Sequence, residues 1–143
     1  MSTVLDDVSD AIRAALAPVV APNDVEMEPA GDPDAFPALD LMINGWRVLE
    51  REANLTRREL SFTVGGYVER GDGLEASQER AELHAAAVAA IMTDPTLGGL
   101  VELTDDGDLR MHTAVLASVR RLAFAQDFVA QLTTSSTNPA LPA

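Results

Sequence analysis

Polar and apolar residues alternate between positions 58 and 64, and this period of two predicts a half-buried strand. Gly65 and Gly66 permit a bulge or bend, and residues 67–70 are expected to extend the strand. The apolar face of this strand consists of Leu60, Phe62 and Val64.

The pattern changes to a helical period over residues 74–92. The apolar side chains recur seven, four, three and four residues apart, which places them on one side of a helix. Asp94 and Pro95 end this helix, because a proline disfavours helical geometry in the residue before it. The predicted apolar stripe consists of Leu74, Ala81, Ala85, Val88 and Met92.

Residues 3–17 predict another helix, which Ser2 or Thr3 can cap and which Pro18 ends or frays. Residues 24–28 alternate in polarity and predict a short edge strand, followed by a loop over residues 29–34.

Residues 36–43 predict a strand that pairs with the strand at 58–64. Asn44 and Gly45 form a dipeptide typical of hairpin turns. The pattern over residues 46–54 fits either a strand or a helical turn, and a strand or extended loop is favoured.

The C-terminal part predicts a short strand at 100–104, an acidic turn at 105–108 and a strand at 109–116. The last strand spans residues 120–134, and Gln126 is the polar exception on its apolar face. That face otherwise carries Leu122, Phe124, Phe128, Ala130 and Leu132.

The order of helix, strands, helix and strands predicts an α+β fold, in which two helices pack on one face of a mainly antiparallel sheet. The opposite face is expected to stay partly polar or to be covered by a neighbour. A single domain is expected over residues 1–132, because the chain of 143 residues can bury a core without disulfides or metals. Residues 133–143 are small, polar and proline-bearing and predict a flexible tail.

The formal net charge is -13, and all ten basic residues are arginine. An acidic excess of this size argues against nucleic-acid binding, which requires cations to displace counterions from phosphates. It suits either a surface past which DNA slides or a soluble acidic domain with no particular partner. We expect a soluble protein made in the cytoplasm, because no segment is typical of a signal peptide or a membrane span.

The sequence offers little chemistry that is typical of an enzyme. Its two histidines, His84 and His112, have no carboxylate at a spacing that would support metal binding or acid–base catalysis, so packing or surface positions are expected. The acidic run at 105–108 lacks the ligand spacing of an EF-hand loop. Nucleophile-elbow, Walker and dinucleotide motifs are absent, so we expect a protein that is not an enzyme and binds no cofactor or metal.

Two strings stand out once the elements are in order: DPTLGGL after the alanine-rich helix, and LAFAQDFVAQLTTSSTNP in the last strand and the tail. With these strings in this element order, nearly the whole chain resembles the tail terminator, or tail completion, proteins of long-tailed bacteriophages and related gene transfer agents. The resemblance implies a structural virion protein that forms a hexameric ring and caps the head-proximal end of the tail tube. Such a ring stops polymerisation of the major tail tube protein and docks to head-completion or neck proteins, while DNA passes through its lumen without specific binding.

The resemblance makes two groups of residues candidates for specific positions in such a ring. Acidic turns are expected to line or flank the lumen and to repel passing DNA: Glu69, Asp72, Asp105, Asp106 and Asp108. The candidates for the subunit interface are Trp46, Arg47, Arg57, Arg58 and Arg110. Core packing for the tryptophan and surface solvation for each arginine are the simpler alternatives.

Three other functions stay open. A head–tail connector or neck protein would also be a ring of this size and composition. A monomeric acidic interaction domain would account for the charge alone. A small-molecule enzyme has the least support, because no nucleophile, base and metal set converges in the sequence.

Overall fold

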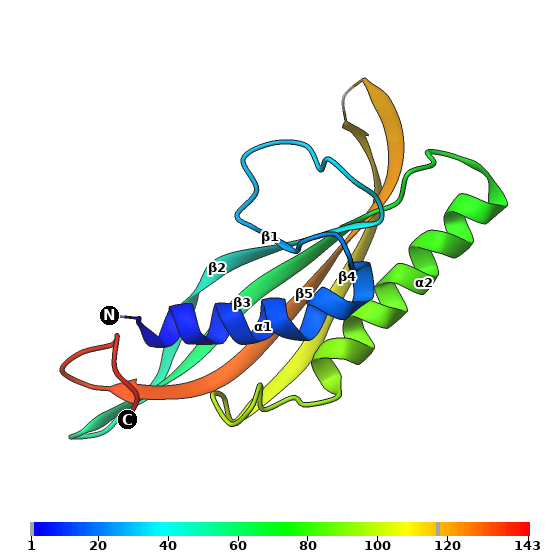
Figure 1. Cartoon of the computed structure of the whole chain (residues 1–143). Coiled ribbons are helices and arrows are strands. Elements are labelled where there is room, and N and C mark those ends of the chain that lie inside the picture. The colour runs from blue at the N-terminus through cyan, green and yellow to red at the C-terminus, as the bar shows by residue number, and fades with distance from the viewer. Residues whose placement is uncertain (1, 117) are drawn as a thin grey trace.

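The computed structural model describes residues 2–116 and 118–143 and shows an α+β fold, as the sequence predicts (Figure 1). The five strands form one sheet in the order β1-β2-β3-β5-β4, in which β1 pairs in parallel with β2 and all other neighbours are antiparallel. Both helices lie on the same face of this sheet. The elements are α1 (Val4–Val20), β1 (Glu26–Met27), β2 (Ala38–Arg51), β3 (Leu55–Tyr67), α2 (Gly73–Met92), β4 (Leu103–Leu116) and β5 (Val119–Ser135).

The core lies between the helices and the faces of β3 and β5 that the alternating pattern predicts to be apolar. Phe62 on β3 stacks on Phe128 on β5, with ring centroids 5.1 Å apart and planes 10° apart. Helix α1 turns its buried residues toward these strands at a spacing of four, which is one face of a helix. The fully buried side chains of α1 include Val8, Ile12 and Leu16.

Helix α1 begins where the sequence predicts and ends later than it predicts. The Thr3 hydroxyl accepts from the Asp6 backbone N–H at 3.1 Å, and the Asp6 carboxylate accepts from the Thr3 N–H at 3.0 Å, which is a reciprocal capping box. The prediction that Pro18 ends or frays the helix is wrong, because α1 continues to Val20. Val20 is buried in the core, and this packing favours the additional turn.

Helix α2 begins one residue before the predicted helix, and its predicted apolar stripe is only partly right: Val88 and Met92 pack partly against the core, whereas Ala81 and Ala85 are exposed. Leu74 is 76 % exposed, whereas Leu83 and Ile91 are buried. Alanine occupies several faces of this helix, so small residues define no clear stripe, and the two large side chains decide which face packs. Ala76 and Ala87 complete the buried face.

The predicted hairpin turn at Asn44 and Gly45 is wrong. Strand β2 passes through both residues with a register shift between Ile43 and Gly45, and Gly45 adopts a φ of 118°. The dipeptide therefore forms a β-bulge, where glycine tolerates the positive φ. The turn lies further along the chain, where the Glu52 N–H donates to the Leu55 carbonyl at 2.9 Å. The favoured strand over residues 46–51 and the pairing of β2 with β3 are confirmed.

The predicted acidic turn at 105–108 is also wrong. These residues lie inside β4, where a register shift between Asp106 and Leu109 marks a bulge. The Gln126 side chain on β5 donates to the Gly107 carbonyl at 2.9 Å and so satisfies a backbone acceptor that the ladder leaves free. The two strands predicted at 100–104 and 109–116 are consequently one strand, preceded by turns over residues 93–102.

Two element ends also differ from the predicted ends. Strand β3 stops at Tyr67, although the Val68 N–H still donates to the Leu122 carbonyl at 3.0 Å. Strand β5 continues to Ser135, into the predicted tail. The rest of the tail folds back onto the start of α1, where the Val4 N–H donates to the Ala140 carbonyl at 3.0 Å (Figure 1). The flexibility of this tail stays a prediction.

Gly66 provides a test of the packing between β3 and β5. A Cβ atom at this position would lie 2.1 Å from Cε2 of Phe124, which is fully packed in the core. We expect Gly66→Ala to lower the free energy of unfolding by about 1–3 kcal/mol, because Phe124 must leave its position. Urea denaturation followed by far-UV circular dichroism measures the change.

Gly31 is the matched control, because a Cβ atom there would meet no heavy atom within 4 Å. Gly31→Ala should leave the midpoint of the urea transition nearly unchanged. Equal effects of the two substitutions would contradict the close packing of Phe124 against β3.

Candidate functional site

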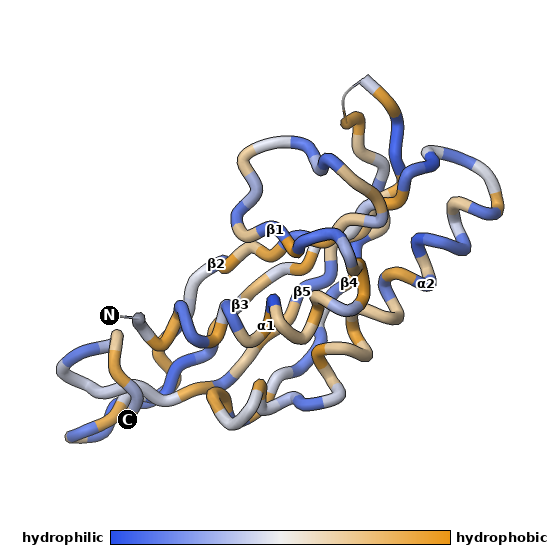
Figure 2. Tube along the Cα trace, viewed as in Figure 1, coloured by the Kyte–Doolittle hydropathy of each residue, from blue (hydrophilic) through white to orange (hydrophobic). Residues whose placement is uncertain are grey.

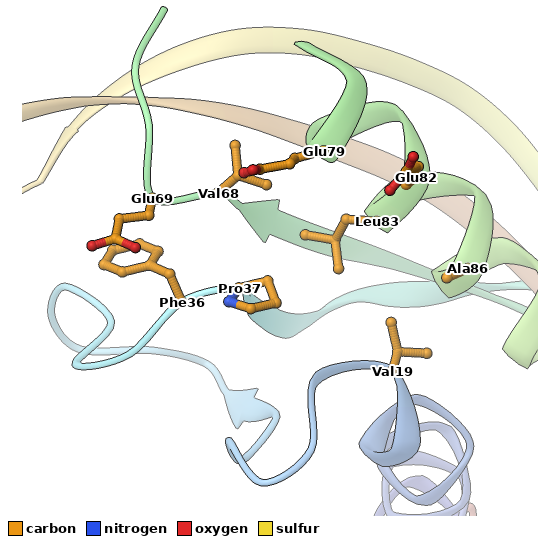
Figure 3. A pocket seen from close by; sticks show the side chains of 9 residues that line it. All are labelled: Val19, Phe36, Pro37, Val68, Glu69, Glu79, Glu82, Leu83 and Ala86. Atoms are coloured by element: carbon orange, nitrogen blue, oxygen red, sulfur yellow. The ribbon is translucent and has the colours of Figure 1, made fainter. Parts of the chain in front are cut away.

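A cleft of about 420 Å³ opens between the end of α1, the middle of α2 and the base of the β2–β3 hairpin (Figure 3). Its walls are mostly apolar, and three glutamates stand at its rim. We call this feature the acidic cleft. The residues that line it are Val19, Phe36, Pro37, Val68, Glu69, Glu79, Glu82, Leu83 and Ala86.

Glu69 and the two glutamates of α2, Glu79 and Glu82, approach the cleft from different elements. Glu79 and Glu82 are three residues apart on α2, and this spacing places them on the same side of the helix. Within the described part of the chain, none of the three carboxylates forms an ion pair. The cleft therefore presents an apolar surface with three carboxylates at its rim that form no ion pair in the described structure.

Arg121 fixes one wall of the acidic cleft. Its guanidinium lies over the ring of Phe36, with Cζ 4.1 Å from the ring centroid, and its Nη1 atom donates to the Glu69 carbonyl at 2.5 Å. The cation–π contact and the hydrogen bond hold the segment before β2 against the segment after β3. The wall is thus preformed by residues that are distant in sequence.

His84 belongs to a polar cluster within the core. Its Nε2 atom lies 2.8 Å from Oε1 of Gln126, and its ring meets the ring of Phe124 edge-on with centroids 5.3 Å apart. Gln126 in turn donates to the bulge of β4, so the polar exception on β5 is hydrogen-bonded at both ends. This contact agrees with the expected packing position of His84. His112 lies on the edge strand β4, and its carbonyl accepts from Nη1 of Arg80 at 3.2 Å.

A buried carboxyl lies on the sheet face opposite the helices. Asp40 is 5 % exposed and lies beside Tyr67 in a cavity of about 320 Å³, below the loop between β1 and β2. Figure 2 shows that this loop is mostly hydrophilic. Burial raises the pKa of Asp40, and the Tyr67 hydroxyl and the Gly65 N–H oppose the rise. Burial and the nearby charge of Asp40 raise the pKa of Tyr67 to about 12.

The arginines predicted for a subunit interface all have partners within the chain. Arg47 pairs with Glu59 at 3.0 Å, and Arg57 lies 3.8 Å from Glu102. Arg110 forms two hydrogen bonds with Asp127, at 2.5 and 3.1 Å, which raise the pKa of Arg110 and lower that of Asp127.

Trp46 and Arg58 form one unit on the helix-side face of the sheet. The Arg58 guanidinium lies over the Trp46 ring with Cζ 4.5 Å from the centroid, and Nε of Arg58 donates to the Thr134 hydroxyl at 3.0 Å. Arg58 is buried, and Trp46 packs partly against the core. Both predicted interface residues therefore have structural contacts inside the subunit.

The predicted lumen residues fall into two separate groups. Asp105 and Asp106 pair with Val129 and Phe128 on β5, and Asp108 lies in the adjacent bulge. Glu69 and Asp72 follow the end of β3. In this segment the Val68 N–H and the Arg70 carbonyl form backbone hydrogen bonds with Leu122 on β5. The structure does not bring the two groups together within one subunit.

An apolar row on the edge strand β4 is not among the residues predicted from the sequence. Leu109, Met111 and Val115 alternate along the helix-side face of β4, because they pair with Gln126, Phe124 and Arg120 on the core-facing side of β5. Their exposed fractions are 39 %, 45 % and 73 %. The period-two pattern is visible in the sequence, but only the sheet order shows that β4 is an edge strand. We call these three residues the β4 apolar row.

The described residues contain no group of three or more histidines and carboxylates arranged to hold a metal ion. Across residues 2–116 and 118–143, no helix is long and apolar enough to cross a membrane. The chain matches no protein-family model, and a search of curated proteins found no match.

Asp40 yields a prediction about pH dependence. The pKa of an aspartate in the unfolded chain is about 3.9, whereas the pKa of folded Asp40 is higher. Between these two values the native state binds more protons than the unfolded state, so wild-type stability falls as the pH rises. We expect Asp40→Asn to be more stable than the wild type at about pH 7, and this gain should disappear below about pH 3.9.

Urea titrations at about pH 7 and below about pH 3.9 measure the difference in free energy of unfolding between Asp40→Asn and the wild type. Asp24→Asn is the control, because Asp24 is exposed. A gain that is the same at both pH values would show that the buried charge of Asp40 is not its cause.

Proposed function

We propose that this protein is a structural virion subunit that forms a ring on the head-proximal end of a long bacteriophage or gene-transfer-agent tail. In this proposal the ring ends polymerisation of the tail tube and docks to the neck of the head. The protein acts by assembly and not by catalysis. The resemblance of the sequence to tail terminators is the starting point, and the open edges of the sheet provide the physical support.

The observation that carries the proposal is the long edge strand β4. Among the described residues, no strand pairs with its outer edge, and the β4 apolar row lies exposed beside that edge. An exposed edge strand of 14 residues with apolar side chains is a site for pairing with another chain. A monomeric protein would normally protect such an edge.

The other side of the sheet offers a complementary edge. The two-residue strand β1 pairs only with Asp40 and Leu41, so the later part of β2 has no strand on its outer side within the described chain. Three successive antiparallel pairings make β2 and β4 antiparallel to each other. The β4 edge of one copy can therefore add to the β2 edge of the next with both copies facing the same way. This is a heterologous contact, which forms a ring where the rotation between copies closes.

Acidic residues near the β4 edge fit the expected electrostatics of such a ring. Asp105, Asp106 and Asp108 surround the exposed bulge of this strand. A ring multiplies the acidic excess of each copy, and a lumen flanked by these carboxylates repels DNA instead of binding it.

The edge contact predicts the effect of a double substitution on assembly. We expect the wild type to form a closed ring of about six subunits on its own or on tube ends, and Leu109→Glu with Met111→Glu to abolish it by placing charges in the contact. Native mass spectrometry and electron microscopy with polymerised tube protein measure the ring and the capping of tube ends.

Leu74→Glu is the control, because Leu74 is an exposed apolar residue on α2 that lies outside the β4 apolar row. It should leave assembly intact. A wild type that neither forms rings nor shortens tubes would contradict the proposed function, and selective binding to a portal complex would indicate the neck protein instead.

The lumen residues are tested separately by reversing their charge. Replacing Asp105, Asp106 and Asp108 by arginine should slow the passage of DNA through the rings that form, because a positive lumen attracts phosphates. Native mass spectrometry must first show that rings still form, because these residues lie in β4 beside the edge contact. DNA ejection from assembled particles measures the effect. Unchanged ejection and infectivity would show that these residues do not flank the lumen.

A further inference from the structure

The acidic cleft and the far end of the β2–β3 hairpin carry complementary chemistry. At that far end Val48 and Leu49 are exposed apolar residues, with exposed fractions of 40 % and 38 %. Arg47 and Arg51 flank them. We call these four residues the hairpin tip.

Both arginines of the hairpin tip are available for a partner. The side chain of Arg47 is 72 % exposed despite its surface pair with Glu59, and such exposed pairs contribute little to stability. Arg51 is exposed and has no ion-pair partner in the described structure. Residues 47–58 contain four of the ten arginines and also two glutamates, Glu50 and Glu52, so this segment carries a net charge of +2 in a chain whose net charge is -13.

The hairpin itself keeps its tip away from its own cleft. Strand β2 begins next to Pro37 in the cleft wall and ends at Arg51, and β3 returns from Leu55 to Tyr67, next to Val68 in the same wall. A strand of 13 residues spans about 40 Å, so the cleft and the tip lie at opposite ends of the molecule. Any contact between them must join two copies.

We propose that the hairpin tip of one copy docks in the acidic cleft of another copy. Val48 and Leu49 then cover the apolar wall formed by residues such as Leu83 and Ala86. Arg47 and Arg51 face the rim carboxylates of Glu69, Glu79 and Glu82, which have no ion-pair partner within the described subunit. A second copy fits this cleft because it supplies aliphatic and cationic groups side by side.

This contact uses neither open edge of the sheet. It joins copies end to end along the strands, whereas edge pairing joins them side by side. It depends on self-association of the chain but not on the capping of a tail tube, so the two proposals can fail separately.

A charge exchange between two variants tests the docking. The cleft variant carries Glu79→Arg and Glu82→Arg, and the tip variant carries Arg47→Glu and Arg51→Glu. Each variant alone places like charges across the contact, so we expect each to lose end-to-end association. Mixed in equal amounts, the two variants offer an opposite charge at every contact and should recover it.

Sedimentation velocity at about 50 mM and about 1 M salt measures association, which should weaken at high salt because the charges are near the surface. The control is Asp7→Arg with Asp10→Arg, which makes the same charge change on exposed residues of α1 that lie outside the cleft. It should associate like the wild type. Variants that associate normally when alone, or a mixture that recovers nothing, would overturn the proposal.

Cross-linking detects even a transient contact, because the chain has no cysteine of its own. Leu49→Cys combined with Ala86→Cys should give disulfide-linked dimers and larger species under mild oxidation. Leu49→Cys combined with Ala14→Cys should not, because Ala14 is exposed on α1 away from the cleft. Equal cross-linking of both pairs, or none at about 1 mM protein, would contradict docking. Rings that persist in the Leu109→Glu, Met111→Glu variant, together with Leu49–Ala86 cross-links, would refute only the edge contact.

Discussion

The pairing of β3 with β5 is the constraint on which the other elements depend. Their register is unbroken over thirteen residue pairs, from Leu55 opposite Ser135 to Tyr67 opposite Ala123. Because side chains alternate between the two faces, this register places the apolar sets of both strands on one side, where Phe62 stacks on Phe128. A shift by one residue would place the two apolar sets on opposite faces and turn one of them away from the helices. The two helices can bury their apolar faces only where this register provides a matching surface.

The two strands that flank the central β3–β5 pair, β2 and β4, expose different surfaces. Strand β2 extends one side of the sheet and β4 extends the other, and neither is fully covered within the described chain. The β2–β3 hairpin also separates the acidic cleft at its base from the hairpin tip at its far end, where Val48 and Leu49 are exposed beside two arginines. Complementary surfaces on opposite sides or ends of one subunit favour heterologous contacts, which repeat from copy to copy.

Several polar groups inside this framework have hydrogen-bond or cation–π partners. Gln126 lies on the apolar face of β5, yet it bonds to His84 and to the bulge of β4. Arg58 is buried, and it contacts both Trp46 and Thr134. Such contacts keep buried polar atoms satisfied and help to fix the register of neighbouring strands. Asp40 is one contrasting case, because one of its carboxylate oxygens has no hydrogen-bond partner in the described structure, as is also true of Thr104 Oγ1 and Arg121 Nε.

Local patterns in the sequence determined the α+β class, the positions of both helices and the apolar faces of β3 and β5, because helical and strand periods are properties of adjacent residues. They could not decide whether Asn44-Gly45 and the acidic run at 105–108 turn the chain or bulge within a strand, since that depends on the partner strand. The packed face of the alanine-rich α2 likewise depended on where Leu83 and Ile91 meet the sheet. The acidic cleft, the β4 apolar row and the separation of tip from cleft arise from strand order and register. Only the tertiary structure decided these surfaces, because they bring together or expose residues that are distant in the chain.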